Sequence, residues 1–336
     1  MAIFSCEQED THELLFPEQA CSNRFARHTD SRRDRWAVIL AGGDGTRLSA
    51  LTRSISGDER PKQFCPIIGG RTLLDQTSRR VALSIPAVQT LTVLTQTHER
   101  FYKPLLKDVP KDRLLVQPEN KGTAPAILFS LLRAAQLAPN ATVALFPSDH
   151  FFADDQQFMS HVDSAFTAAQ TNPNVITLLG IKPESPEVEY GWIEPETSLF
   201  AQMPRAISRV RRFWEKPNLN VAKALMNQGC LWNSFVMVGR VDSFLRMTQR
   251  ALPELYESFS AIAPTFGTES EARALNNLYS WIPSSNFSQE VLSQRTDDLA
   301  VMQVSEVGWS DLGEPKRVFS TLQRIGMQTQ WAAPVA

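Results

Sequence analysis

A glycine-rich turn followed by two cations is the part of this sequence best suited to phosphate chemistry. The segment Trp36–Leu48 reads W-A-V-I-L-A-G-G-D-G-T-R-L, and Arg60–Phe64 reads R-P-K-Q-F. A turn built from glycines lacks the Cβ atoms that would keep backbone N–H groups away from phosphate oxygens. Arg47 can grip a phosphate with two nitrogens, and Lys62 adds a point charge. Because the apolar run Val38–Leu40 predicts a buried strand before the turn, the two segments together predict a nucleoside triphosphate site.

Two other phosphate-binding patterns fit this segment less well. A dinucleotide fingerprint needs G-x-G-x-x-G, whereas the third glycine position here is Leu48. A Walker A loop needs G-x-x-x-x-G-K-[ST], which the sequence lacks. A plain strand-to-helix turn would explain two adjacent glycines, but it does not explain the T-R-L and P-K-Q-F that follow them.

The elements that must position these residues alternate between strand and helix from Trp36 onward. Apolar runs predict strands at 36–41, 91–95, 113–117, 142–146 and 175–180, with helical patterns between them, for example at 72–82 and 124–136. This alternation predicts an α/β fold with a Rossmann-like, doubly wound, mostly parallel sheet and helices on both faces. Ligands of such sheets bind at the carboxyl ends of the strands, so Gly42, Gln117 and Asp149 should meet in one cleft.

The pattern changes after residue 180. Strands of antiparallel or mixed type are predicted at 190–194, 207–214 and 230–238, and helices at 243–259, 269–278 and 314–325. We therefore expect one domain at 36–325 with two halves, 36–180 and a smaller mixed β half at 181–325. Residues 1–35 are polar and are expected to form a mobile extension, with 326–336 as a C-terminal tail.

Composition bounds the partners and the compartment. Of the 336 residues, 43% are hydrophobic and 21% are charged, and 34 Lys and Arg against 36 Asp and Glu give a net charge of −2. This balance gives no support to a nucleic-acid partner, and no apolar run is long enough to indicate a membrane partner. Four scattered cysteines, without a C-x-x-C pair, indicate neither a zinc site nor a disulfide framework. The simplest location is a reducing cytoplasm.

Six further motifs give the sequence a family resemblance. It resembles the sugar-nucleotide pyrophosphorylases, a nucleotidyltransferase family, and P-K-Q-F points to the mannose-1-phosphate guanylyltransferase branch. The further motifs follow in the order of that family: Q-P-E-N-K-G-T-A-P-A at 117–126, P-S-D-H at 147–150, Y-G-W-I-E at 190–194, E-K-P at 215–217, L-W-N-S at 231–234 and G-W-S-D-L-G at 308–313.

The resemblance implies a reaction between two anions. An oxygen of a sugar-1-phosphate, with mannose-1-phosphate favoured, attacks the α-phosphorus of a nucleoside triphosphate, with GTP favoured, to give GDP-mannose and pyrophosphate. Such a reaction needs alignment of the substrates and neutralisation of charge rather than a nucleophilic side chain. The glycines, cations and aspartates of the motifs supply those needs.

Roles can then be assigned to individual residues. Arg47, Lys62 and Asp149 are expected to be catalytic. Asp149, at a strand end, is the first expected Mg²⁺ ligand, and the resemblance adds Asp311 as the second. The nucleotide-binding set is Ala41, Gly42, Gly43, Gly45, Thr46, Arg47, Lys62, Gln117, Asn120, Gly122 and Thr123. The resemblance places the sugar phosphate at Gly191, Glu215, Lys216 and Asn233.

Three departures from the family pattern leave the choice of sugar open. Phe235 stands where the family usually has Gly after W-N-S, and Ser288 stands where an Asp is common. The spacer at 54–60 before P-K-Q-F is longer than usual. Two alternatives therefore remain: the same reaction with another sugar or base, and a non-catalytic homologue that binds a sugar nucleotide and regulates a partner. The oligomeric state also stays open, a homodimer included.

Overall fold

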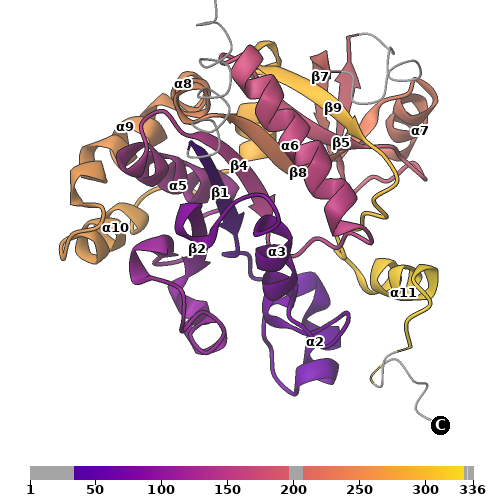
Figure 1. Cartoon of the computed structure of the whole chain (residues 1–336), viewed down its shortest axis with the longest axis horizontal. Helices are drawn as coiled ribbons and strands as arrows, with labels where there is room; N and C mark the ends of the chain where they lie inside the picture. Colours follow the sequence, from indigo (N-terminus) through magenta and orange to yellow (C-terminus); the bar gives the residue numbers. More distant parts are fainter. Residues whose placement is uncertain (1–33, 197–206, 329–330, 332–336) are drawn as a thin grey trace, which may run out of the picture. The chain divides into compact units, whose positions relative to one another are not determined.

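The computed structural model describes residues 34–196, 207–328 and 331 (Figure 1). The residues from Arg35 onward form one compact unit, and only this unit is considered below. The polar extension expected at 1–35 and most of the tail expected at 326–336 lie outside the described residues. Among the helices of the described residues, none combines the length and the apolar character needed to cross a bilayer.

A nine-stranded sheet forms the middle of this unit, with its strands in the order β3-β2-β1-β4-β8-β5-β9-β7-β6. In chain order the strands are β1 (Arg35–Leu40), β2 (Thr90–Thr95), β3 (Leu114–Gln117), β4 (Thr142–Pro147), β5 (Ile176–Ile181), β6 (Gly191–Pro195), β7 (Ile207–Glu215), β8 (Leu231–Arg240) and β9 (Leu299–Val304). The expected strands are all present within one or two residues of their predicted ends, and β9 is an addition to them.

The expectation of a mostly parallel sheet is wrong. Strands β3, β2, β1 and β4 are parallel, as are β5 and β9, but β8 runs antiparallel to both β4 and β5, and β7 runs antiparallel to β6 and β9. The sheet is therefore mixed. Strand β8, which comes later in the chain, is inserted between β4 and β5.

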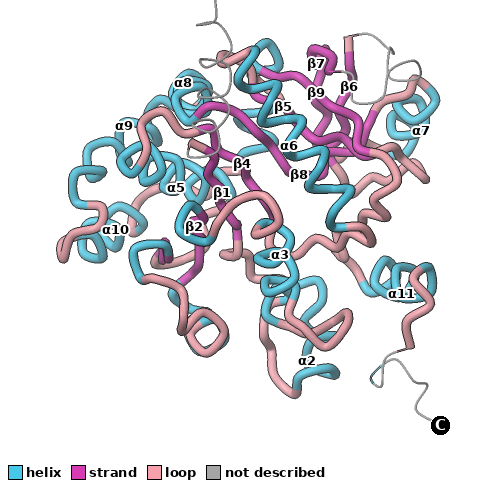
Figure 2. The backbone as a smooth tube through the Cα atoms, in the orientation of Figure 1, coloured by secondary structure: helices cyan, strands magenta, loops and turns pink. Residues whose placement is uncertain are grey.

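Helices cover both faces of the sheet, as the alternation predicted. Ala37 and Ile39 of β1 pack with α3 and α6, whereas Trp36 and Val38 pack with α5 and the helices α8–α10. In Figure 2 the magenta strands lie between these two sets of helices. The helices are α2 (Ser49–Ser56), α3 (Leu73–Val81), α4 (Glu99–Tyr102), α5 (Thr123–Leu137), α6 (Asp155–Thr171), α7 (Leu219–Asn227), α8 (Val241–Ala251), α9 (Pro253–Ile262), α10 (Glu271–Tyr279) and α11 (Pro315–Arg324).

The single helix predicted at 243–259 is two helices in the structure. Helix α8 ends at Ala251, and Pro253 is the first residue of α9. Proline is favoured at the first helical position because its missing N–H would have no partner there, and it drives the preceding residue out of the helical region. Leu252 accordingly has φ −134° and ψ 64°.

A bulge in β8 changes the direction of its side chains. Leu178 of β5 pairs with Met237 and Gly180 pairs with Asn233, so three residues of β8, 234–236, lie opposite Leu179 alone. Bulges of this kind re-aim side chains and are frequent beside active sites. Here the bulge contains Phe235, whose φ of 60° is in the left-handed region.

A buried arginine supports the loop that follows β4. The Arg80 guanidinium lies 4.7 Å from the centre of the Phe152 ring and donates to Thr77 Oγ1 at 3.3 Å. Thr77 donates in turn to the carbonyl of Ser148 at 3.3 Å, and Asp155 at the start of α6 pairs with Arg80. Because Arg80 is only 2% exposed, Asp155 is the carboxylate that compensates its charge.

We expect Asp155→Asn to lower the free energy of unfolding by about 1–3 kcal/mol, because it leaves a buried guanidinium with a neutral partner. Asp75→Asn is the matched control, since Asp75 pairs with Arg79 on the exposed side of α3. The control should change the stability by about 0.5 kcal/mol or less. Urea unfolding measures both, and equal effects would show that Arg80 does not depend on Asp155.

Candidate active site

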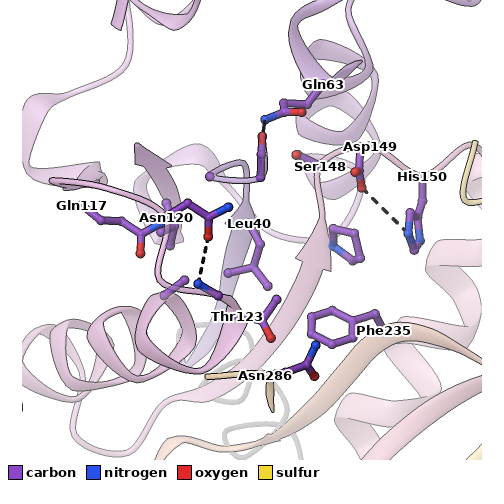
Figure 3. A pocket seen from close by; sticks show the side chains of 16 residues that line it. Leu40, Gln63, Gln117, Asn120, Thr123, Ser148, Asp149, His150, Phe235 and Asn286 are labelled. Carbon is purple, nitrogen blue, oxygen red and sulfur yellow. Dashed lines mark hydrogen bonds and ion pairs between the residues drawn. The ribbon is translucent and has the colours of Figure 1, made fainter. Parts of the chain in front are cut away.

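A cavity of about 340 Å³ opens at the carboxyl ends of β1 and β4 (Figure 3). Gly42, Gln117 and Asp149 all line this central cavity, as the strand ends predicted. The full lining consists of Leu40, Gly42, Gly43, Gln63, Val93, Gln117, Asn120, Gly122, Thr123, Ala126, Pro147, Ser148, Asp149, His150, Phe235 and Asn286. The cavity thus has an apolar part and a ring of amide, hydroxyl and carboxylate groups.

The glycine turn is held by Gln63. Its Nε2 atom donates to the carbonyl of Ala41 at 3.1 Å and to that of Gly43 at 2.6 Å. With those carbonyls engaged on one side, the peptide N–H groups of the turn remain as the donors for a phosphate. Gln63 is absent from the expected binding residues, although the P-K-Q-F motif contained the signal for it.

Gly45 brings the two phosphate-binding segments together. Its φ of 63° is left-handed, and a Cβ at this position would lie 2.9 Å from the backbone nitrogen of Lys62. Thr46 and Arg47 follow in a short 3₁₀ turn, Thr46–Leu48. Arg47 does not line the central cavity; its guanidinium pairs at 3.2 Å with Glu189, and both side chains are exposed.

Lys62 is a buried cation surrounded by oxygen atoms. Its Nζ lies 2.7 Å from the carbonyl oxygen of Asp311, 3.1 Å from Oδ2 of Asp149 and 3.4 Å from the carbonyl of Leu312. These contacts join the 3₁₀ turn Lys62–Phe64, the end of β4 and the segment before α11. A fixed ammonium beside a carboxylate at the mouth of a glycine turn is suited to stabilising charge on a phosphoryl group.

Asp149 and Asp311 both reach Lys62, but through different atoms. The Asp311 carboxylate accepts from the Tyr190 hydroxyl and the Gly313 N–H, each at 2.9 Å, and lies 2.8 Å from Nε of Arg317. Burial alone would raise the pKa of Asp311, but the charges of Lys62 and Arg317 outweigh it and hold that pKa below its usual range. Asp149 has fewer partners and lines the central cavity, so its carboxylate is the one available to a ligand.

His150 is a neutral neighbour of Asp149. Burial lowers the pKa of its imidazole, although Asp149 acts in the opposite direction. The indole N–H of Trp309 donates to Nδ1 of His150 at 3.3 Å, so the ring proton is on Nε2, which lies 3.8 Å from Asp149. At that distance the imidazole is a neighbour of the Asp149 carboxylate without a hydrogen bond to it.

At the other end of the cavity, two polar contacts hold the side-chain amide of Gln117. Its Oε1 accepts from the hydroxyl of Tyr279 at 2.9 Å, and its Nε2 lies 3.4 Å from Oγ1 of Thr95. The amide is thus fixed in orientation, and one of its two N–H groups has no part in these contacts. Neither Tyr279 nor Thr95 belongs to the motifs that pointed to a nucleotide.

The start of α5 is fixed by a segment distant in sequence. Gly122 has φ 88°, and a Cβ there would overlap the carbonyl oxygen of Ser285. The Oγ1 atom of Thr123 accepts from the N–H of Phe287 at 2.8 Å. Asn120 accepts from the Gly122 N–H at 2.9 Å, so hydrogen bonds hold the loop that carries these expected nucleotide-binding residues.

Three of the four residues expected at the sugar phosphate lie on strands β6, β7 and β8, and Lys216 directly follows β7. Gly191 of β6 pairs with Glu215 of β7, and Asn233 lies on β8. Burial raises the pKa of Glu215, an effect that Lys216 partly offsets. None of the four lines the central cavity, and Oδ1 of Asn233 accepts from the backbone N–H of Phe235 at 3.0 Å.

We expect Gly45→Ala to lower the free energy of unfolding by about 1–3 kcal/mol, because the new Cβ combines left-handed strain with a contact to the Lys62 backbone. Gly43→Ala is the control, since its Cβ would meet no atom within 4 Å. The control should stay within about 0.5 kcal/mol of the parent in urea unfolding. Similar losses in both variants would contradict the link between Gly45 and Lys62.

Known proteins resemble this chain over most of its length. XanB of Xanthomonas campestris, a xanthan biosynthesis protein, is 29% identical over 293 residues, which cover 86% of this chain and 60% of XanB. Mannose-1-phosphate guanylyltransferase of Salmonella montevideo is 28% identical over 282 residues, covering 82% of this chain and 57% of that protein. The chain therefore spans about 60% of the length of these curated relatives.

Solved structures and a family model complete the comparison. A structure from Thermus thermophilus, described as a mannose-1-phosphate geranyltransferase, matches with a TM-score of 0.74 at 26% identity, covering 88% of this chain and 80% of that chain. The fold is shared with UDP-glucose pyrophosphorylase. That structure matches with a TM-score of 0.53 at 16% identity, covering 87% of this chain and 98% of that chain. The model of the family described as nucleotidyl transferase matches residues 36–326, and this chain belongs to that family.

Proposed function

We propose that the protein joins a sugar-1-phosphate to the nucleoside monophosphate part of a nucleoside triphosphate and releases pyrophosphate. The observation that carries this proposal is the Lys62 ammonium, held 3.1 Å from the Asp149 carboxylate beside the glycine turn. Mannose-1-phosphate and GTP are the proposed substrates, because relatives from Salmonella and Escherichia coli are named mannose-1-phosphate guanylyltransferases.

The proposed chemistry assigns one task to each group of residues. An oxygen of the sugar phosphate attacks the α-phosphorus, and the bond from that phosphorus to the oxygen shared with the β-phosphate breaks. Backbone N–H groups of the turn at 42–45 bind the triphosphate, and Lys62 stabilises the charge that gathers around the α-phosphate. Arg47 exchanges Glu189 for a phosphate when the triphosphate binds, since a phosphate offers the guanidinium a stronger partner.

Magnesium is the proposed cofactor, and Asp149 fits it better than Asp311, because the Asp149 carboxylate lines the central cavity whereas that of Asp311 pairs with Arg317. Within the described part of the chain, no three His, Cys, Asp or Glu side chains gather in a way that could hold a metal by themselves. Magnesium often binds through one or two carboxylates plus substrate phosphates, which is what Asp149 and Asp311 would offer. The bound ion would supply charge neutralisation, and Arg317 competes with it for the carboxylate of Asp311.

A different base or sugar is the second candidate for the same site. The observation that favours it is Phe235, which lines the central cavity at a position where the family usually has glycine. A side chain in place of a hydrogen alters the space offered to the substrate. The glycine turn, Lys62 and Asp149 would act on the phosphates in the same way for any base.

A panel of nucleoside triphosphates and sugar-1-phosphates tests the proposal through release of pyrophosphate. We expect magnesium-dependent release, fastest with GTP and mannose-1-phosphate. Another preferred pair would retain the reaction and correct the specificity. A binding signal without pyrophosphate from any pair would support the regulatory alternative instead.

Asn variants of the two carboxylates test the shared metal. We expect Asp149→Asn and Asp311→Asn each to lower turnover by at least about 100-fold, because each removes charge at the phosphates. Electron paramagnetic resonance of free Mn²⁺, titrated with enzyme and GTP, should show weaker binding in both variants. The loss should be larger for Asp149→Asn, because Arg317 already occupies Asp311. Unchanged Mn²⁺ binding in Asp149→Asn would remove that residue from the metal site.

A further inference from the structure

Phe235 has a left-handed backbone conformation in the bulge of β8, at the wall of the central cavity. Its φ of 60° is one that bulky side chains rarely adopt, because the Cβ atom crowds the backbone. Two neighbours hold it there: Asn233 Oδ1 accepts the Phe235 N–H at 3.0 Å, and Ser234 Oγ accepts the Val236 N–H at 3.2 Å. Strain of this kind persists where the surroundings fix it and is concentrated at functional sites.

The bulge directs the ring into the central cavity. In Figure 3 Phe235 lies between Thr123 and Asn286 on one side and His150 on the other, facing the middle of the cavity. Leu145 of β4 pairs with Met237, the residue just beyond the bulge, and Pro147, the last residue of β4, lines the same cavity as Phe235. The ring is half-buried and belongs to the wall of the cavity.

The two ends of the cavity determine what the ring would meet. Under the proposed function the phosphates lie near Asp149, which Lys62 contacts, and the base lies near Gln117 and Gly122, which line the same cavity. Phe235 reaches the wall between these ends from β8. A nucleotide bound with its α-phosphate at Lys62 and its base near Gln117 would pass its ribose and the near face of the base along this ring.

We propose that Phe235 is a nucleotide-binding residue whose ring packs against the nucleoside of the triphosphate. This inference rests on the proposed function, and it assigns Phe235 to nucleotide recognition rather than to the sugar phosphate. A flat aromatic ring stacks on a base or packs on ribose carbons without distinguishing among hydrogen-bonding groups. Glycine, usual here in the family, would leave this part of the wall open.

A simpler explanation is that the ring only fills space in the core. Phe235 does pack against the cluster that contains α5 and α8. A filler would not require a left-handed residue, however, because a strand residue of ordinary conformation can present an apolar side chain to the core. Leucine at this position separates the two explanations, since it keeps the apolar bulk and the strained backbone but loses the planar ring.

The experiment compares Phe235→Leu, Phe235→Gly and Phe235→Tyr with the parent chain. Calorimetry gives the dissociation constants of GTP, ATP, UTP and CTP, and of inorganic tripolyphosphate, which has no nucleoside. Without the ring, Phe235→Leu and Phe235→Gly should bind the preferred nucleotide about 10-fold more weakly, which is within the range measured for base–aromatic contacts. Phe235→Tyr should bind it as the parent does, and tripolyphosphate should bind all four proteins alike. Thermal unfolding confirms that each variant is folded.

The outcomes separate this inference from the proposed function. Equal nucleotide affinity in all four proteins, or tighter binding by Phe235→Gly, would overturn the role of Phe235 and leave the reaction in place. A change in the KM for the sugar-1-phosphate alone would overturn it too, by placing the ring at the other substrate. Failure of the parent chain to bind any triphosphate would overturn both proposals.

Discussion

The buried ammonium of Lys62 is the contact on which the geometry of the site depends. A cation removed from water requires oxygen partners, and Lys62 finds them in the Asp149 carboxylate and in the carbonyls of Asp311 and Leu312. Those partners come from the end of β4 and from a segment 249 and 250 residues beyond Lys62. The requirement therefore joins the end of β4 to the segment before α11, and Gly45 lets the turn after β1 approach the same point.

Two aspartates contact Lys62, and they differ in their partners and in the atoms that make the contact. Asp311 is neutralised by Arg317 and fixed by Tyr190, so it acts on Lys62 through its backbone. Asp149 keeps a carboxylate facing the cavity, where a cation and a phosphate would meet. Without ligands, both carboxylates and Arg47 already have protein partners. The site thus avoids bare charges before substrate arrives, and binding exchanges one set of ionic partners for another.

The sequence predicted local features better than long-range ones. Periodicity located the strands of 36–180 and their ligand-binding ends, because a buried strand followed by glycine or aspartate is a local pattern. It did not reveal that β8 is inserted between β4 and β5, since strand order depends on contacts between distant segments. For the same reason Tyr279 on Gln117 and Arg317 on Asp311 were missed. The departure at Phe235 was visible in the sequence, but its position in the central cavity follows from the β8 bulge.

The role of Lys62 in transfer is tested most directly by following the α-phosphate in Lys62→Met. With a nucleoside triphosphate labelled at the α-phosphorus, single-turnover experiments separate binding of the nucleotide from its transfer to the sugar phosphate. We expect the parent chain to place the label in the nucleotide sugar. We expect Lys62→Met to bind the triphosphate with little loss but to transfer the label at least about 100-fold more slowly. Transfer at the parent rate in Lys62→Met, or label that stays out of the sugar product in the parent, would contradict the central role of Lys62.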